Sequence, residues 1–261
     1  MSAKFDRRAK ALQDASKPLE ALLGILSSLV SPPILYDFID GHRGYRYEDP
    51  GLIHFCLLKG AKAVSAYNAS VVLLRSGYTQ EIAVLIRTLI ECTRHIDFAL
   101  GGMLTNQKQD EKPQKFVESY FEDENRGFGE LKKKPHERQE NIHKGIAAEA
   151  RKVATSLGQN ADDFDMIGAM RRTYEANSNY VHARYPELMD MYGGTPGRFH
   201  LRGMRDTPKD LENLEVLECY LASLENCFAL MVHSLALKPA VATNKTTAVW
   251  FEERRRLAAL A

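Results

Sequence analysis

Two long apolar segments joined by a very short connection constrain the fold of this chain most strongly. The first runs from about residue 52 to 75 and the second from about 79 to 100, with Ser76-Gly77 between them. In both segments apolar residues recur every three or four positions, which is typical of an amphipathic helix. Because glycine commonly ends a helix and a short connection joins neighbouring helices, the sequence predicts an antiparallel helical hairpin.

The same periodicity continues beyond this hairpin. Residues 165–182 and 208–237 are predicted to form two more long helices, and residues 247–260 a short amphipathic helix. Residues 105–144 are rich in Gln, Lys, Glu and Pro, so they are expected to form a polar excursion from the core. We therefore predict an all-α fold. It is a single domain over residues 1–261, built on an up-down bundle of four long helices with peripheral helices.

The composition is that of an ordinary globular protein, with 44% hydrophobic and 26% charged residues. The sequence has 35 Lys and Arg residues and 34 Asp and Glu residues, so its net charge gives no general attraction to nucleic acid or membranes. The 4 cysteines form no CxxC pair and lie among apolar neighbours, which suits a reducing compartment. No segment approaches the ~20 apolar residues of a membrane span. We expect a cytoplasmic protein without membrane association.

The predicted helix at 165–182 carries polar residues on the side expected to pack. That side holds Ile167, Met170, Tyr174, Ser178 and Val181, with Arg171 and His182 at its edge. Buried polar groups need hydrogen-bond partners, so aligned polar groups indicate either a binding pocket or a structural hydrogen-bond network between helices. Both interpretations remain open at this point.

If the polar residues form a pocket, each has a role that its chemistry suggests. His182 is the candidate acid or base, because the imidazole pKa lies near neutrality. Arg171 is the candidate anion-binding catalytic residue, since a guanidinium matches phosphate geometry. Tyr174, Asn177 and Ser178 are the candidate substrate-binding residues of this helix.

The second arm of the hairpin offers three more candidates. Arg87, Glu91 and Arg94 are spaced i, i+4 and i+7, which places them on one helix face. They form either a solvated ladder of ion pairs or a charged cluster buried against another helix, since Ile90 and Phe98 border the same face. In the second case they are expected to contribute to substrate binding.

The sequence lacks the common patterns of metal-binding and cofactor-binding residues. A di-iron bundle needs two Glu-x-x-His pairs on inward faces. Only Glu140-x-x-His143 matches, and it lies in a Lys-rich polar stretch. The sequence contains neither a phosphate-cradling glycine loop nor a Gly-x-Ser-x-Gly elbow. We expect no metal and no cofactor.

Three short motifs occur in a particular order. They are Gly77-Tyr78-x-x-Glu81, then Leu85-x-Arg87-x-x-x-Glu91, then Tyr174-x-x-x-Ser178-x-x-Val181-His182. In this order the pieces resemble a group of uncharacterised bacterial helical proteins. That group in turn resembles the HEPN (higher eukaryotes and prokaryotes nucleotide-binding) bundles, and the resemblance covers about residues 52–237.

The resemblance implies a protein that binds or acts on RNA or a nucleotide, in a toxin–antitoxin or phage-defence setting, and that forms a homodimer. Many HEPN proteins are metal-independent ribonucleases in which four to six residues separate an arginine from the histidine that follows it. Ahead of His182 these positions hold Glu175, Ala176 and Asn177, whereas Arg138-x4-His143 has the spacing. Three hypotheses follow: a ribonuclease or nucleotide-acting protein, a non-catalytic HEPN-like module, and an unrelated interaction or assembly module with a structural polar network.

Overall fold

The computed structural model describes residues 2–37, 41, 43–122, 139–159, 165–192 and 199–258 of the chain. The helices are α1 (Ser2–Ala15), α2 (Lys17–Ser28), α3 (Leu52–Ser76), α4 (Thr79–Ala99), α5 (Met103–Asn106), α6 (Glu111–Glu122), α7 (Gln139–Ser156), α8 (Met166–Val181), α9 (Tyr185–Met189), α10 (Pro208–Ser234), α11 (Lys238–Thr243) and α12 (Lys245–Ala258). The structure is mostly helical, which confirms the predicted all-α class.

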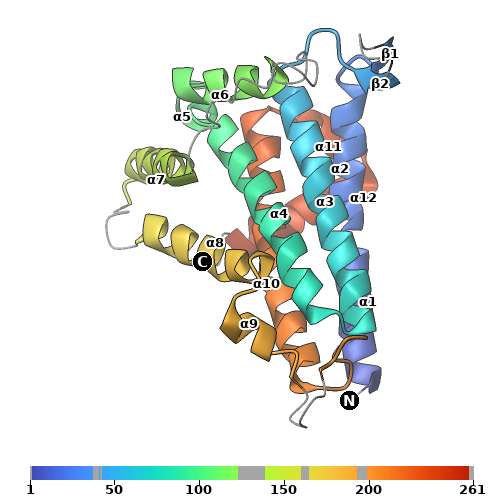
Figure 1. The fold of residues 1–261 in the computed structure, drawn as a ribbon. Helices are drawn as coiled ribbons and strands as arrows, with labels where there is room; N and C mark the ends of the chain where they lie inside the picture. Colours follow the sequence, from blue (N-terminus) through green and yellow to red (C-terminus); the bar gives the residue numbers. More distant parts are fainter. Residues whose placement is uncertain are drawn as a thin grey trace.

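The predicted hairpin is formed by α3 and α4 (Figure 1). Gly77 ends α3 with φ 77°, a left-handed conformation in which glycine carries no steric penalty. Its carbonyl accepts a 2.7 Å hydrogen bond from the Met204 backbone N–H. Gly203, at φ 92°, approaches so closely that an added Cβ would lie 2.6 Å from the Ser76 carbonyl oxygen. The segment that leads into α10 is therefore fixed against the hairpin turn.

The main core lies among α1, α2, α3, α4 and α10. Figure 1 shows α3, α4 and α10 side by side, with α1 and α2 end to end along them. Leu19, Leu22, Tyr67 and Phe228 are fully buried there. The Tyr67 hydroxyl is satisfied because it donates a 3.1 Å hydrogen bond to the Leu12 carbonyl. Each Å² of apolar surface removed from water stabilises the fold by about 25 cal/mol. This cluster is therefore the main source of stability.

The small residues of α3 and the apolar side of α12 both pack inside the chain. Gly60 of α3 packs so closely that an added Cβ would lie 3.0 Å from Leu23 and 3.4 Å from Phe228. Trp250 and Phe251 of α12 are buried, and α12 contacts α2. The small residues of α3 thus bring α2 and α10 close, and they are not an external surface.

The helix at 165–182 differs from the prediction. It was expected to be one of four long bundle helices, but α8 lies across α4 instead of running along it (Figure 1). Asn177 is its one buried residue. The fourth long position of the bundle is filled by α1 and α2, whose helical pattern is interrupted only around Ser16.

A short hairpin, β1 (Ile34–Asp37) and β2 (Arg43–Arg46), was not predicted. The strands are antiparallel, with Ile34 opposite Arg46 and Asp37 opposite Arg43. All four residues of β1 are exposed, so the alternation of buried and exposed residues that marks a strand in sequence is missing. Within the described residues this two-stranded sheet is the only sheet.

The predicted polar excursion is partly structured. Helices α6 and α7 lie on either side of residues 123–138, which are outside the described part. Phe116 of α6 contacts Phe98 of α4 with ring centroids 5.3 Å apart, and Phe55 of α3 at 5.6 Å. These aromatic contacts fix α6 against the end of the hairpin.

Candidate functional site

The two candidate catalytic residues lie at the surface. Arg171 is 73% exposed and its Nε donates a 2.9 Å hydrogen bond to Glu175. His182 is exposed and follows the last residue of α8, where its backbone N–H caps the Ser178 carbonyl. Eleven residues of helix separate the two, or about 16 Å along the axis at 1.5 Å per residue. The structure therefore does not bring them together.

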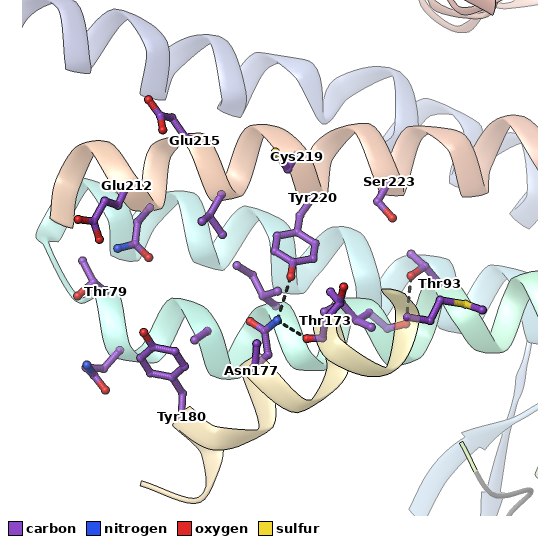
Figure 2. A pocket seen from close by; sticks show the side chains of 18 of the residues that line it. Thr79, Thr93, Thr173, Asn177, Tyr180, Glu212, Glu215, Cys219, Tyr220 and Ser223 are labelled. Atoms are coloured by element: carbon purple, nitrogen blue, oxygen red, sulfur yellow. Dashed lines mark hydrogen bonds between the residues drawn. The ribbon is translucent and has the colours of Figure 1, made fainter. Parts of the chain in front are cut away.

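The side of α8 that the apolar pattern predicted to pack is half-buried at Ile167, Met170, Tyr174 and Ser178. Val181 is 47% exposed, whereas Asn177 faces inward. The Asn177 side-chain amide donates 2.9 Å hydrogen bonds to the Thr173 carbonyl and to the Tyr220 hydroxyl of α10 (Figure 2). Helix α8 packs against the outside of the bundle and not within its core. Its inward side can therefore be polar and hydrogen-bond to α10, while Val181 stays in solvent.

Arg87 and Glu91 form a half-buried cluster with Tyr174. The Arg87 guanidinium stacks on the Tyr174 ring, 3.5 Å from its centroid, and also donates a hydrogen bond to the Tyr174 hydroxyl. Its Nη1 lies 2.5 Å from Glu91 Oε1, with side-chain exposures of 15% for Arg87 and 36% for Glu91. The hairpin ladder therefore faces α8 and is not a wholly solvated row of ion pairs.

Arg94 is buried and paired with a residue from the polar excursion. Its Nη1 donates a 3.0 Å hydrogen bond to Nε2 of His143 on α7, and both side chains are buried. Burial lowers the pKa of Arg94 to about 10. Burial, with the nearby Arg94 charge, lowers the pKa of His143 to about 4, so the imidazole is neutral and can accept. His143 is thus engaged by an arginine and not placed as a metal ligand, while Arg138 lies outside the described residues.

Asp97 lies one turn beyond Arg94 on the same helix. Burial raises the pKa of its carboxyl to about 6, although the Cys227 thiol and the Arg94 charge oppose this. Its Oδ1 atom has no hydrogen-bond partner among the described residues. An unpartnered buried carboxyl oxygen is costly, so Asp97 is a strong candidate for a functional residue.

Arg94, Asp97 and Asn177 line a hollow of about 900 Å³ between α4, α8 and α10. Its walls are mostly apolar, and on α4 they include residues at three- or four-residue spacing, namely Ala83, Ile86, Ile90, Thr93 and Asp97. Figure 2 shows the Tyr220 ring reaching from α10 toward Asn177 of α8, with Ser223 and Thr93 farther along the same side. Burial raises the pKa of Tyr220, so its hydroxyl keeps its proton. Since Tyr220 accepts from Asn177, that proton is available to a ligand.

The opposite end of the hollow is charged but internally paired. Lys209 lies 3.4 Å from Asp190 and 2.9 Å from Glu212. The Tyr180 hydroxyl donates a 3.0 Å hydrogen bond to Asp190, and burial raises the Tyr180 pKa to about 12. This end is a compensated network, so it offers little net positive charge to an anion.

Of the residues proposed from sequence, Asn177 and Arg94 line the hollow. Arg87, Glu91 and Tyr174 form the neighbouring cluster between α4 and α8, whereas Arg171, Ser178 and His182 lie outside both groups. Asp97, Tyr220 and Lys209 also line the hollow and were not predicted from the sequence. Asp97 had a usable signal, because a lone carboxylate stands in the apolar run His95-Ile96-Asp97-Phe98-Ala99-Leu100.

A family model, the Family of unknown function (DUF5677), matches residues 54–199. This is more than half of the chain. The chain belongs to this family. The matched part includes α4 and α8, which form two walls of the hollow, and ends before α10. No curated protein and no solved structure gives a significant match.

Two further features bear on the class of the protein. Among the described residues, no helix has the length and apolar character needed to cross a membrane. In the same part of the chain, no group of three or more His, Cys, Asp or Glu side chains is arranged to hold a metal ion.

Proposed function

We propose that the protein is a HEPN-like helical binding module whose hollow between α4, α8 and α10 takes a small nucleobase-containing ligand. The observation that carries this proposal is the hollow itself. Its volume of about 900 Å³ lies within the range of small-molecule sites. Apolar walls suit a flat ring, and a few convergent polar groups suit the ring's hydrogen-bonding edge.

The polar groups favour the base over the phosphate. Arg94 and Lys209 are the basic residues of the lining, against Asp97, Asp190, Glu212 and Glu215. Lys209 is already compensated by two carboxylates, and Arg94 is buried. A polyphosphate or an RNA backbone would meet net negative charge inside the hollow. We therefore place the base, or a nucleoside, inside it and any phosphate at its mouth.

Binding is better supported than RNA cleavage. A metal-independent ribonuclease needs a histidine and a phosphate-binding cation around one phosphodiester. His182 and Arg171 are about 16 Å apart along α8, and Arg171 is paired with Glu175. A setting in toxin–antitoxin or phage-defence systems fits a ligand-sensing module as well as a nuclease.

Isothermal titration calorimetry tests the proposal. The four common ribonucleosides, their 5′-monophosphates and a short single-stranded RNA are titrated separately into the full chain. We expect at least one nucleoside to bind, with a Kd below about 1 mM, and Asn177→Leu to weaken that binding by about ten-fold or more. Arg171→Ala, outside the hollow, is the matched control. If no nucleoside or nucleotide binds, or if Asn177→Leu and Arg171→Ala behave alike, the proposal is wrong.

A further inference from the structure

Arg94 and Asp97 present complementary chemistry at one end of the hollow. They are three residues apart on α4, so they project from the same side of the helix, and both line the hollow. Among the described residues no hydrogen bond or ion pair joins them, although each responds to the charge of the other. One is a donor group and the other an acceptor group, and they face the same space.

Both groups have hydrogen-bonding capacity left. Oδ1 of Asp97 is buried without a partner among the described residues. A guanidinium has several N–H donors, and the structure shows one of those of Arg94 bound, to His143. Buried polar groups in folded proteins are nearly always satisfied, so this combination indicates a ligand that supplies what is missing.

We infer that Arg94 and Asp97 together recognise a ligand edge that carries an N–H donor next to a hydrogen-bond acceptor. The donor binds Asp97 and the acceptor receives a hydrogen bond from Arg94. The inference rests on the proposed function when the edge belongs to a nucleobase, such as the exocyclic amine and neighbouring ring nitrogen of adenine. The same chemistry occurs in a free α-amino acid, whose ammonium and carboxylate are also a donor beside an acceptor.

The surroundings of Arg94 and Asp97 strengthen their preference for a ligand that carries the N–H donor. Ile90 and Met170 also line the hollow, so water competes weakly for these groups once a ligand is bound. His143 binds Nη1 of Arg94, and Arg94 lines the hollow, so His143 fixes the guanidinium there and is a positioning residue. A ligand without the donor would leave Oδ1 of Asp97 unsatisfied, and that penalty is larger than the gain from one more hydrogen bond.

A pair of ligands that differ only in the exocyclic amino group tests the inference on the unmodified protein. Adenosine has this N–H donor, whereas purine riboside, in which a hydrogen replaces the amino group, has no donor on its base. We expect adenosine to bind at least about ten-fold more tightly by calorimetry. In Asp97→Ala this preference should disappear, and in Asp97→Asn, which keeps an acceptor oxygen, part of it should remain. Circular dichroism checks that both variants fold, and the ligand pair on the unmodified chain decides the question even if they do not.

A second comparison distinguishes an amino acid ligand from a nucleobase ligand. L-leucine is compared with 4-methylpentanoate, which has the same side chain and carboxylate but no amino group. If adenosine and purine riboside bind equally well, the inference is wrong while the proposed function stands. If no nucleoside binds but L-leucine does, in a manner that Asp97→Ala abolishes, the edge recognition is supported and the nucleobase proposal fails. If none of these four compounds binds, the inference is wrong, and the titrations of the other nucleosides and nucleotides decide the proposed function by themselves.

Discussion

Arg94 of α4 donates a hydrogen bond to the neutral imidazole of His143 on α7, and both side chains are buried. This contact ties the hairpin to a helix that the sequence placed in a polar excursion. It also explains why a buried arginine is tolerated without a carboxylate directly bound to it. The partner is a neutral acceptor, and Asp97 one turn away supplies negative charge at longer range.

Removing the acceptor should destabilise the protein. His143→Ala leaves the buried guanidinium without its partner, and we expect the free energy of unfolding to fall by about 2–3 kcal/mol. His143→Gln, whose side-chain oxygen can accept, should lose less than about half of that. Urea unfolding followed by circular dichroism at pH 7.5 measures both. Equal losses in the two variants would show that the hydrogen bond is not the stabilising element.

His143 should also make stability depend on pH. Its folded pKa of about 4 lies below the ordinary value of 6.5, so the unfolded chain binds the extra proton between these values. The contribution is fully present above pH 6.5 and is lost as pH falls toward 4. Relative to His143→Gln, the unmodified protein should lose stability over this window. A constant difference between the two proteins from pH 7 to 4.5 would contradict the depressed pKa.

Asp97 should change the pH dependence of stability in the opposite direction from His143. Its folded pKa of about 6 exceeds the ordinary 3.8, so the folded state holds a proton that the unfolded state releases, and its contribution is lost as pH rises through 6. At pH 7.5 Asp97→Asn, which removes the buried charge, should therefore be more stable than the unmodified chain by about 2 kcal/mol. The gain should shrink toward pH 4. Asp37→Asn, in the exposed pair with Arg43, is the control and should change little.

The hairpin could be predicted from sequence because local rules decide it. The apolar periodicity of residues 52–100 and the glycine at 77 depend only on residues close to each other in sequence. The structure places the ends of α3 and α4 within one residue of the expected bounds. The class of the fold followed for the same reason.

The packing of α8 could be predicted only in part. Tyr174 and Ser178 of the expected side are half-buried, but Val181 is exposed and the buried residue is Asn177. Whether a polar side is buried depends on a partner far away in sequence, here Tyr220 of α10. The pairing of Arg94 with His143 is of the same kind, since residues 49 positions apart meet only through the tertiary fold.

The cluster of Arg87, Glu91 and Tyr174 should contribute measurably to stability. Glu91→Ala leaves a mostly buried Arg87 without its carboxylate, although the Tyr174 ring still covers it. Since Glu91 is itself partly exposed, we expect a loss of about 1–2 kcal/mol, between the values for buried and surface pairs. Glu175→Ala, which removes the exposed partner of Arg171, should cost under about 0.5 kcal/mol. Equal melting temperatures for the two variants would show that the cluster behaves as an ordinary surface pair.

His182 separates the binding proposal from the ribonuclease hypothesis. Because the side chain is exposed beyond the end of α8, His182→Ala should change the free energy of unfolding by less than about 0.5 kcal/mol. It lies outside the lining of the hollow, so nucleoside affinity should also stay the same. Incubation of the purified protein with a labelled single-stranded RNA should give no cleavage that this substitution removes. Metal-independent cleavage that is lost in a folded His182→Ala variant, and kept in Asn177→Leu, would instead establish the nuclease and move the functional site to the end of α8.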